Sequence, residues 1–456
     1  MKKYISYILI FSFFILLVSF FILNKTLFNN PRFNILYKSP ENCTNFSVFN
    51  LNDGNFLYLE PNKDIITFNL IDTKTKKIKK INELKREFLG YVPDFIKLSD
   101  DKFLVTLKRS TKESKENLPQ MLTYLYDYKN NKIKKLNILS NNFVSRSIFD
   151  SGNDILTVSA SKNGYGCQNI EEIINYDLKN DKIISKSKFK NADFCAMSPL
   201  GNGRFLLYNY DNKTTSSKQR QVIKNSKKAY GIYDYKENKI IKPDKNSEPV
   251  EYGVFPSSLK TSGDKFLLRH FNGSGSIYTT DFKTVEKFSD EEKVLDIKDK
   301  EILIQNGANF YLYNVGTKAK EPQAELNSCT YFYGLNNSYK DFIFNCNSTL
   351  KSLNPKEKTY KNLSGLNFLL SKQPSFYSLD SETTLIVTDD MNYIYDENKN
   401  KIKDKVEFSY KIPDKMIYSL QILNNNGAIF AVYNAAGLKK NDILSARNII
   451  EFLKIK

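Results

Sequence analysis

The chain repeats one short stretch, Tyr126-Asp127-Tyr128-Lys129-Asn130-Asn131-Lys132-Ile133. The same frame returns at residues 176–183, 233–240 and 395–402, and a related version occupies residues 71–78. Weaker versions begin at Thr280, Tyr313 and Leu353. The copies follow one another at roughly 35 to 60 residues, a period that is typical of an array of repeated structural units.

Each copy predicts a β-hairpin. A strand ends in Tyr-Asp, a polar turn follows, and a second strand opens with Lys-Ile; Asp and Asn suit such turns because their side chains accept hydrogen bonds from nearby backbone amides. A strand with its own turn signal precedes each hairpin, as at residues 101–105, 203–207, 264–268 and 300–304. An additional apolar strand lies before that one, for example at 143–149 or 194–200. Four short strands per unit indicate the blade of a β-propeller.

Composition supports an all-β fold. The chain has 33 Phe and 29 Tyr, and such residues suit the half-buried faces of sheets. No long helical periodicity appears after residue 24. We interpret the aromatic residues as packing between sheets rather than as a binding cage.

The number of blades follows from the strand pattern and from the length. Candidate inner strands begin near residues 46, 92, 143, 194, 254, 294, 329, 375 and 416. Division of the chain into typical blades of about 45 to 50 residues favours eight blades, with seven and nine also acceptable. The ring is one folding domain, because each blade buries its faces only against its neighbours.

The N-terminus differs in kind from the rest of the chain. Residues 4–23 carry no charge and are long enough to cross a bilayer as a helix. The stretch ends without the small residues of a cleavage site, which favours an uncleaved anchor over a signal peptide. Lys2 and Lys3 precede it, so the N-terminus is expected in the cytoplasm and the propeller outside, in the periplasm or at the cell surface.

Three parts of the chain are therefore expected. Residues 1–24 form a cytoplasmic tip and a transmembrane anchor, and residues 25–44 form a short connector. Residues 45–456 form the propeller. A strand at 33–37 is a candidate to close the ring against segments 428–433 and 449–453.

The chain is strongly basic. It has 68 Lys plus Arg against 50 Asp plus Glu, a formal net charge of +18. An exported domain meets acidic glycans, wall polymers and phospholipid head groups rather than nucleic acid, so we expect a protein or an anionic envelope polymer as partner and no nucleic acid.

Five cysteines fit an oxidising compartment. Cys329 and Cys346 would lie on neighbouring strands of one unit, and Cys167 and Cys195 would lie in adjacent units, so these are the two disulfides that we expect. Cys43 would be left over, near the membrane. No Cys-x-x-Cys occurs, which leaves a zinc or thioredoxin-type site without support.

Unequal unit lengths give the best indication of a binding face. The connections between the second and third strands are long in three consecutive units, at residues 108–118, 161–169 and 211–228. In a four-stranded blade these connections emerge on one face, and insertions on one face often mark a binding surface. Candidate binding residues in these loops are basic: Lys108, Arg109, Lys112, Lys115, Lys213, Lys218, Arg220, Lys224, Lys227 and Lys228.

The stretch Gly201-Asn202-Gly203-Arg204-Phe205-Leu206-Leu207, followed by Tyr233-Asp234, resembles the kelch repeat. In that family a glycine or aspartate turn leads a hydrophobic strand, and a Tyr-Asp hairpin follows. The resemblance covers most of residues 46–406. This chain has no Gly-Gly pair and no Trp, and both are typical of the family. The resemblance implies a kelch-like propeller.

Missing residues limit the enzymes that the chain could be. Copper radical oxidases on kelch-like propellers need two histidine ligands, whereas this chain has only His270. Phosphate-binding loops, nucleophile elbows and His-Glu-x-x-His motifs are absent from the sequence. We therefore expect no cofactor, no metal and no catalytic residue.

The leading hypothesis is a membrane-anchored, extracytoplasmic propeller that acts as a non-enzymatic binding module. The alternative is a glycan hydrolase or lyase that uses carboxylates at the central channel. A purely structural scaffold is a third hypothesis.

Overall fold

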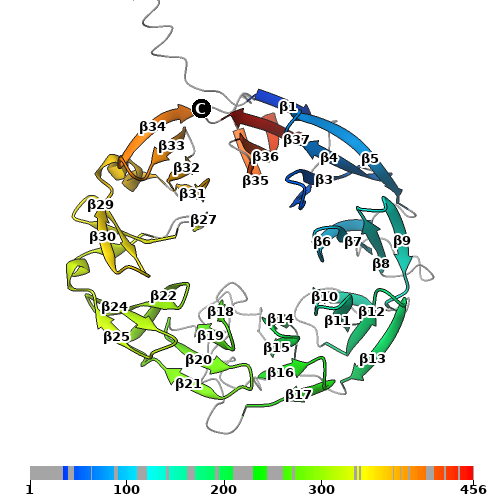
Figure 1. The fold of residues 1–456 in the computed structure, drawn as a ribbon, viewed down its shortest axis with the longest axis horizontal. Coiled ribbons are helices and arrows are strands. Elements are labelled where there is room, and N and C mark those ends of the chain that lie inside the picture. The colour runs from blue at the N-terminus through cyan, green and yellow to red at the C-terminus, as the bar shows by residue number, and fades with distance from the viewer. Residues whose placement is uncertain are drawn as a thin grey trace, which may run out of the picture.

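A computed structural model describes most of the chain from residue 34 onward. The described residues are 34–39, 46–62, 64–86, 91–109, 121–139, 143–161, 170–189, 194, 196–208, 230–243, 260–269, 273–332, 336–337, 340–372, 374–380, 382–388, 391–406, 415–425, 428–439 and 442–454. Their strands form eight four-stranded sheets and one five-stranded sheet. The sheets stand side by side in a closed ring (Figure 1). The protein is therefore a β-propeller, and we number its blades 1 to 9 along the chain.

In blades 1 to 8, four strands form an antiparallel meander that runs from the centre of the ring to its rim (Figure 1). Blades 1 to 3 contain β2 (Ser47–Asn50), β3 (Phe56–Pro61), β4 (Ile65–Asp72), β5 (Lys77–Lys85); β6 (Tyr91–Lys97), β7 (Lys102–Arg109), β8 (Met121–Asp127), β9 (Lys132–Leu136); and β10 (Val144–Asp150), β11 (Ile155–Ser161), β12 (Glu172–Asp177), β13 (Lys182–Lys188). Blades 4 to 6 contain β14 (Ala196–Gly201), β15 (Arg204–Tyr208), β16 (Tyr230–Asp234), β17 (Lys239–Ile241); β18 (Lys260–Ser262), β19 (Lys265–Arg269), β20 (Gly275–Thr279), β21 (Thr284–Lys287); and β22 (Glu292–Lys298), β23 (Glu301–Asn306), β24 (Asn309–Asn314), β25 (Lys320–Pro322).

The last three blades carry the irregular features of the ring. They contain β26 (Thr330–Tyr331), β28 (Phe342–Cys346), β29 (Thr349–Asn354), β30 (Thr359–Asn362); β31 (Ser375–Ser378), β32 (Thr383–Val387), β33 (Asn392–Asp396), β34 (Lys401–Val406); and β35 (Lys415–Asn425), β36 (Ala428–Lys439), β37 (Asp442–Lys454) with β1 (Asn34–Lys38). The fifth strand of blade 8 is β27 (Asn336–Asn337), which pairs in parallel with β31. Two 3₁₀ helices, η4 (Ala324–Leu326) and η5 (Ser364–Ser371), follow blades 6 and 7.

The observed number of sheets lies within the predicted range of seven to nine, although length alone favoured eight. The difference arises in the later blades. Only residues 307–308 separate β23 from β24, and only residues 347–348 separate β28 from β29. These blades therefore use fewer residues than a typical blade, and the length accommodates one more.

The five copies of the repeated stretch form the outer hairpins of blades 1 to 4 and of blade 8. In blade 2, the Asp127 carboxylate accepts a hydrogen bond from the Asn130 backbone amide at 2.9 Å. Asn131 takes the left-handed conformation at φ 49°, which Asn tolerates better than most residues. The buried Tyr126 hydroxyl donates to the Asn131 side chain at 3.1 Å. Tyr, Asp and Asn thus occupy fixed places because each satisfies a specific hydrogen bond in the turn.

The same turn also joins neighbouring blades. The Asn131 side-chain amide donates to the Ile81 carbonyl in the outer strand of blade 1, at 3.1 Å. In blade 4, Asn238 accepts hydrogen bonds from Tyr233 of its own blade at 2.8 Å and from Ser187 of blade 3 at 2.7 Å. The repeat is therefore an element of blade stacking.

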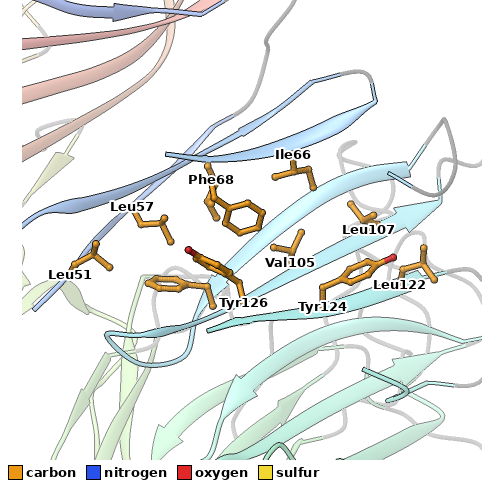
Figure 2. Close-up of a cluster of buried hydrophobic side chains, with 11 residues drawn as sticks. Leu51, Leu57, Ile66, Phe68, Val105, Leu107, Leu122, Tyr124 and Tyr126 are labelled. Carbon is orange, nitrogen blue, oxygen red and sulfur yellow. The ribbon is translucent and has the colours of Figure 1, made fainter. Parts of the chain in front are cut away.

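Apolar side chains fill the space between neighbouring blades. Figure 2 shows the cluster between blades 1 and 2, where Phe68 of β4 lies against Tyr126 of β8, with ring centroids 4.4 Å apart. Both residues are fully buried. The predicted role of the aromatic residues, packing between sheets, is confirmed at this contact.

The two ends of the described chain meet in blade 9. β1 pairs antiparallel with β37, with Asn34 opposite Phe452 and Lys38 opposite Ile449 (Figure 1). The strand considered for ring closure thus forms the outer edge of a blade whose other three strands come from the C-terminal segment. The ring is closed by hydrogen bonds between segments more than 400 residues apart in sequence.

The meander gives the disc two different faces. We call turn face the side that carries the hairpins between first and second strands and between third and fourth strands, such as residues 98–101 and 128–131. We call loop face the opposite side, which carries the second-to-third connections and the links between blades. β1 begins and β37 ends on the turn face, because their register sets Asn34 beside the C-terminal end of β37.

The predicted transmembrane segment, residues 4–23, lies outside the described residues. Within the described part, the structure contains no helix with the length and apolar character to span a bilayer.

Candidate functional site

Three consecutive blades carry the long connections of the loop face. Residues 110–120 connect β7 to β8, residues 162–171 connect β11 to β12, and residues 209–229 connect β15 to β16. In the other blades this connection is short, as at residues 62–64 between β3 and β4. All three long connections start from strand ends on the same face of the disc, so they emerge from one sector of the loop face.

Two of the predicted binding residues lie in the described structure, at the end of β7. Lys108 pairs with the Asp94 carboxylate of the inner strand β6 at 3.7 Å; the Lys108 side chain is half-buried and the Asp94 side chain is exposed. Lys108 lies opposite Val92 and Arg109 opposite Tyr91 in the sheet. Val92 is 51% exposed. The edge of the loop face at blade 2 therefore combines basic groups with an exposed apolar side chain.

The other predicted binding residues lie outside the described residues. These are Lys112, Lys115, Lys213, Lys218, Arg220, Lys224, Lys227 and Lys228. The same holds for Cys43, Cys167, Cys195 and His270. Their roles stay predictions.

Cys329 and Cys346 form a disulfide, with sulfur atoms 2.08 Å apart. Cys329 precedes β26, and Cys346 ends the neighbouring strand β28. Both belong to the apolar cluster between blades 6 and 7, in which the Phe310 and Phe344 rings also meet. The disulfide thus fastens the inner strand of blade 7.

Carboxylates of the inner strands bear on the enzyme alternative. Asp296 of β22 accepts a hydrogen bond from the Tyr331 hydroxyl at 3.0 Å and lies 3.8 Å from Lys298. Asp94 pairs with Lys108. Among the described residues, no three His, Cys, Asp or Glu side chains are grouped as a metal site requires.

Cations on the turn face bridge most pairs of neighbouring blades. Lys102, the first residue of β7, pairs with Asp154 of blade 3, and Arg204, the first residue of β15, pairs with Asp281 of blade 5. The hydrogen bond with Asp154 raises the pKa of Lys102. Further bridges are Lys97 to the Asn50 carbonyl, Lys265 to the Val315 carbonyl, Lys298 over the Phe342 ring and Lys340 to Glu397.

The boundary between blades 3 and 4 differs. Lys102 and Arg204 each lie opposite the Asp of the Tyr-Asp stretch in their own blade, Asp127 and Asp234 respectively. In blade 3 the residue opposite this Asp, Asp177, is Ile155. Within the described parts of these two blades, no lysine or arginine spans the boundary in an ion pair or a hydrogen bond.

A cavity of about 210 Å³ opens on the turn face at this boundary. Asp150, Ser151 and Asn153 line it from blade 3, and residues 199–205, Tyr235 and Lys236 contribute from blade 4. Gly203 is required here, because its φ is +77° and a Cβ atom would lie 2.0 Å from the Tyr235 ring. Sequence reasoning missed this cavity. Its only signal in the sequence is Ile155, at the position that Lys102 and Arg204 hold in their units.

Comparison with known proteins extends only to the fold. No protein-family model and no curated protein matches the chain. The kelch resemblance therefore stays a prediction.

Solved structures of other propellers are similar to this chain at low identity. The C-terminal WD40 domain of Sif2 is 10% identical, over 92% of this chain and 99% of that chain, with a TM-score of 0.47. The uncharacterized protein lmo1340 from Listeria monocytogenes EGD-e is 11% identical, over 84% and 98%, with a TM-score of 0.40. The β-propeller domain of Cps50 (Swd1) from Myceliophteria thermophila is 9% identical, over 93% and 100%, with a TM-score of 0.34. Identities and TM-scores this low say nothing about what the chain binds. The β-propeller assignment follows from the observed ring of sheets.

Proposed function

We propose that the protein is a membrane-anchored, extracytoplasmic propeller that binds a partner on its loop face without catalysing a reaction. The observation that carries the proposal is the grouping of the three long connections, after β7, β11 and β15, on one sector of one face. Insertions confined to one face of a repeat protein often form its binding surface.

The charge of these connections suggests the kind of partner. Residues 209–229 contain six Lys or Arg and one Asp, and flexible ammonium and guanidinium groups match anionic groups. The partner is therefore an anionic envelope polymer or a protein with an acidic surface.

The path of the chain gives the proposed orientation. β1 begins on the turn face, so an anchor at residues 4–23 would attach to that side. Ten residues between anchor and β1 span at most about 35 Å. The turn face then lies toward the membrane, and the loop face points away from it, where partners are accessible.

Capture from envelope extract tests this function. The segment from residue 30 onward would be immobilised and exposed to extract at low and at high salt, and we expect an anionic species that is retained at both. Retention at high salt would indicate more than charge attraction. No retained species at either salt would contradict the proposal.

A matched pair of variants locates the binding face. The first changes Lys213, Lys218, Arg220, Lys224, Lys227 and Lys228 to Ser. The control changes Lys77, Lys79, Lys129, Lys132, Lys179 and Lys182 to Ser, which are exposed residues of the turns and outer strands. Both remove six positive charges. We expect loss of capture only in the first variant, whereas equal capture by both would support a structural scaffold instead.

A further inference from the structure

The described part of the loop face carries apolar as well as basic side chains, which narrows the kind of partner. Four large apolar side chains are exposed among the described residues. Val92 and Phe368 lie on the loop face, whereas Ile183 and Ile184 lie in β13 at the rim of the disc (Figure 1). We propose that the loop face binds a protein whose surface combines carboxylates with apolar side chains, rather than a glycan or a phosphate polymer. The inference rests on the proposed function and names its class of partner.

Val92 is fixed at the loop-face end of the inner strand β6. It is 51% exposed and lies opposite Lys108 of β7. The Lys108 ammonium group lies 3.7 Å from the Asp94 carboxylate, and a surface ion pair of this kind contributes little energy. Together with Arg109, the last residue of β7, these groups leave one net positive charge beside the apolar side chain. A carboxylate of a partner can therefore meet this charge while an apolar group next to it covers Val92.

Phe368 is held in place at the loop face of blade 8. It belongs to η5, which links blade 7 to blade 8 and is fixed by the buried side chains of Leu366 and Leu369. The Phe368 ring is 38% exposed and packs edge-on against Tyr393, with ring centroids 4.8 Å apart. The Lys372 ammonium group lies 5.9 Å from the centre of the Phe368 ring. An aromatic side chain that is already ordered loses little entropy on binding, so Phe368 suits the anchor of an interface.

Both places combine an apolar side chain with a lysine, and they lie apart on the loop face. They belong to blades 2 and 8, and blades 9 and 1 lie between them in the ring (Figure 1). A partner that covers both places needs a broad surface, and stable protein interfaces bury about 800 Å² on each partner.

The apolar side chains distinguish between the classes of partner. Polyphosphate or polyuronate chains bring negative charge, but the aliphatic side chain of Val92 offers them neither a charge nor a hydrogen bond. Protein surfaces bring carboxylates together with apolar groups, and the buried centre of a protein interface is depleted in charge and enriched in aromatic residues. A protein therefore fits both kinds of group on the loop face.

The test measures binding of defined polymers to the full chain in nanodiscs of neutral lipid. The probes are a random copolymer of glutamate and tyrosine, polyglutamate, polygalacturonate and polyphosphate, with empty nanodiscs as the background. All four probes are anionic, and only the copolymer carries aromatic side chains. At about 0.15 M salt we expect the copolymer to bind roughly tenfold more tightly than each of the others, because only this probe buries the exposed apolar surface. Equal binding of the copolymer and polyglutamate would overturn the inference.

Single changes connect the preference to the loop face. Val92→Ser and Phe368→Ser should each reduce the preference for the copolymer over polyglutamate roughly threefold, and circular dichroism checks that both variants fold. Ile184→Ser is the matched control, because it removes a side chain that is also 51% exposed but lies at the rim, and it should leave the preference unchanged. A preference that survives both loop-face changes, or that falls equally in Ile184→Ser, would sink the inference.

Failure of the inference is distinct from failure of the proposed function. Polygalacturonate or polyphosphate could bind as tightly as the copolymer and lose this binding when the six basic residues of the 209–229 connection are changed to Ser. That result would overturn the inference and support the proposed function. Binding of none of the probes would also overturn the inference, whereas the proposed function would still be decided by capture from envelope extract.

Discussion

Replacement of Tyr233 by Phe tests the inference that the repeated hairpin holds neighbouring blades together. Tyr233 is fully buried. Its hydroxyl accepts a hydrogen bond from the Asn175 side chain of blade 3 at 2.8 Å and donates one to Asn238 at 2.8 Å. The change Tyr233→Phe removes both bonds and leaves the packing of the ring in place.

The size of the effect depends on the groups that lose a partner. Asn175 is 2% exposed. Without Tyr233 its side-chain NH₂ group keeps only the hydrogen bond to Ser185 at 2.8 Å, while its Oδ1 still accepts from Thr157 at 2.9 Å. A buried donor without a partner costs about 1 to 3 kcal/mol. Asn238 is exposed and keeps its bond from Ser187, so it adds little. We expect Tyr233→Phe to lower the free energy of unfolding by about 1 to 2 kcal/mol.

Tyr126→Phe is the matched control. Its hydroxyl donates only to Asn131 at 3.1 Å, and the Asn131 side chain is exposed and also accepts from Asn82 at 2.8 Å. The expected cost is below about 1 kcal/mol. Urea unfolding of the full chain in detergent, followed by circular dichroism, measures both. Hydrogen exchange of the β12 and β16 amides should localise the larger loss to the boundary of blades 3 and 4. Equal costs in the two variants would refute the reasoning.

Three further predictions follow from the fold. Replacement of Cys329 and Cys346 together by Ala should lower the free energy of unfolding by about 3 kcal/mol, because their separation of 17 residues sets the loop that the disulfide closes; an unchanged urea midpoint would contradict this. Deletion of β1 leaves β37 without its outer neighbour, so the shortened chain should lose cooperative unfolding and aggregate, as size-exclusion chromatography would show. Burial raises the pKa of Tyr313 and of Tyr360 to about 12. Because the folded state holds these protons more tightly than the unfolded state, the stabilising contribution of the two hydroxyls should be fully present below pH 10 and should fall as the pH rises from about 10 to 12. Thermal melts in that window measure it, and a melting temperature that does not change there would contradict the raised pKa values.

The hairpins of the blades could be predicted from the sequence. The Tyr-Asp frame predicted hairpins at residues 126–133 and 176–183, and both are present as β8–β9 and β12–β13. This succeeded because a hairpin turn is satisfied by residues within a few positions of one another, as Asp127 and Asn130 show. The apolar strand pattern likewise predicted the four-stranded blade.

Features that depend on contacts between distant parts of the chain could be predicted only in part. The unequal connections were visible from strand spacing, and the loop face follows from the meander. The cavity was not predicted, because it depends on how Asp150 of one blade and Tyr235 of another approach each other across a boundary. Such an approach depends on the rotation between blades, which no local pattern encodes.

By itself the sequence determined the building unit of this protein, since each hairpin is specified by its own Tyr, Asp and Asn residues. Only the tertiary structure decided that nine blades close a ring through β1 and β37, and that the turns of blades 3 and 4 meet around a cavity. The physical reason is distance along the chain. Turns are stabilised by contacts within a few residues, whereas ring closure and blade boundaries are stabilised by contacts between residues tens to hundreds of positions apart, whose geometry is set by the packing of whole sheets.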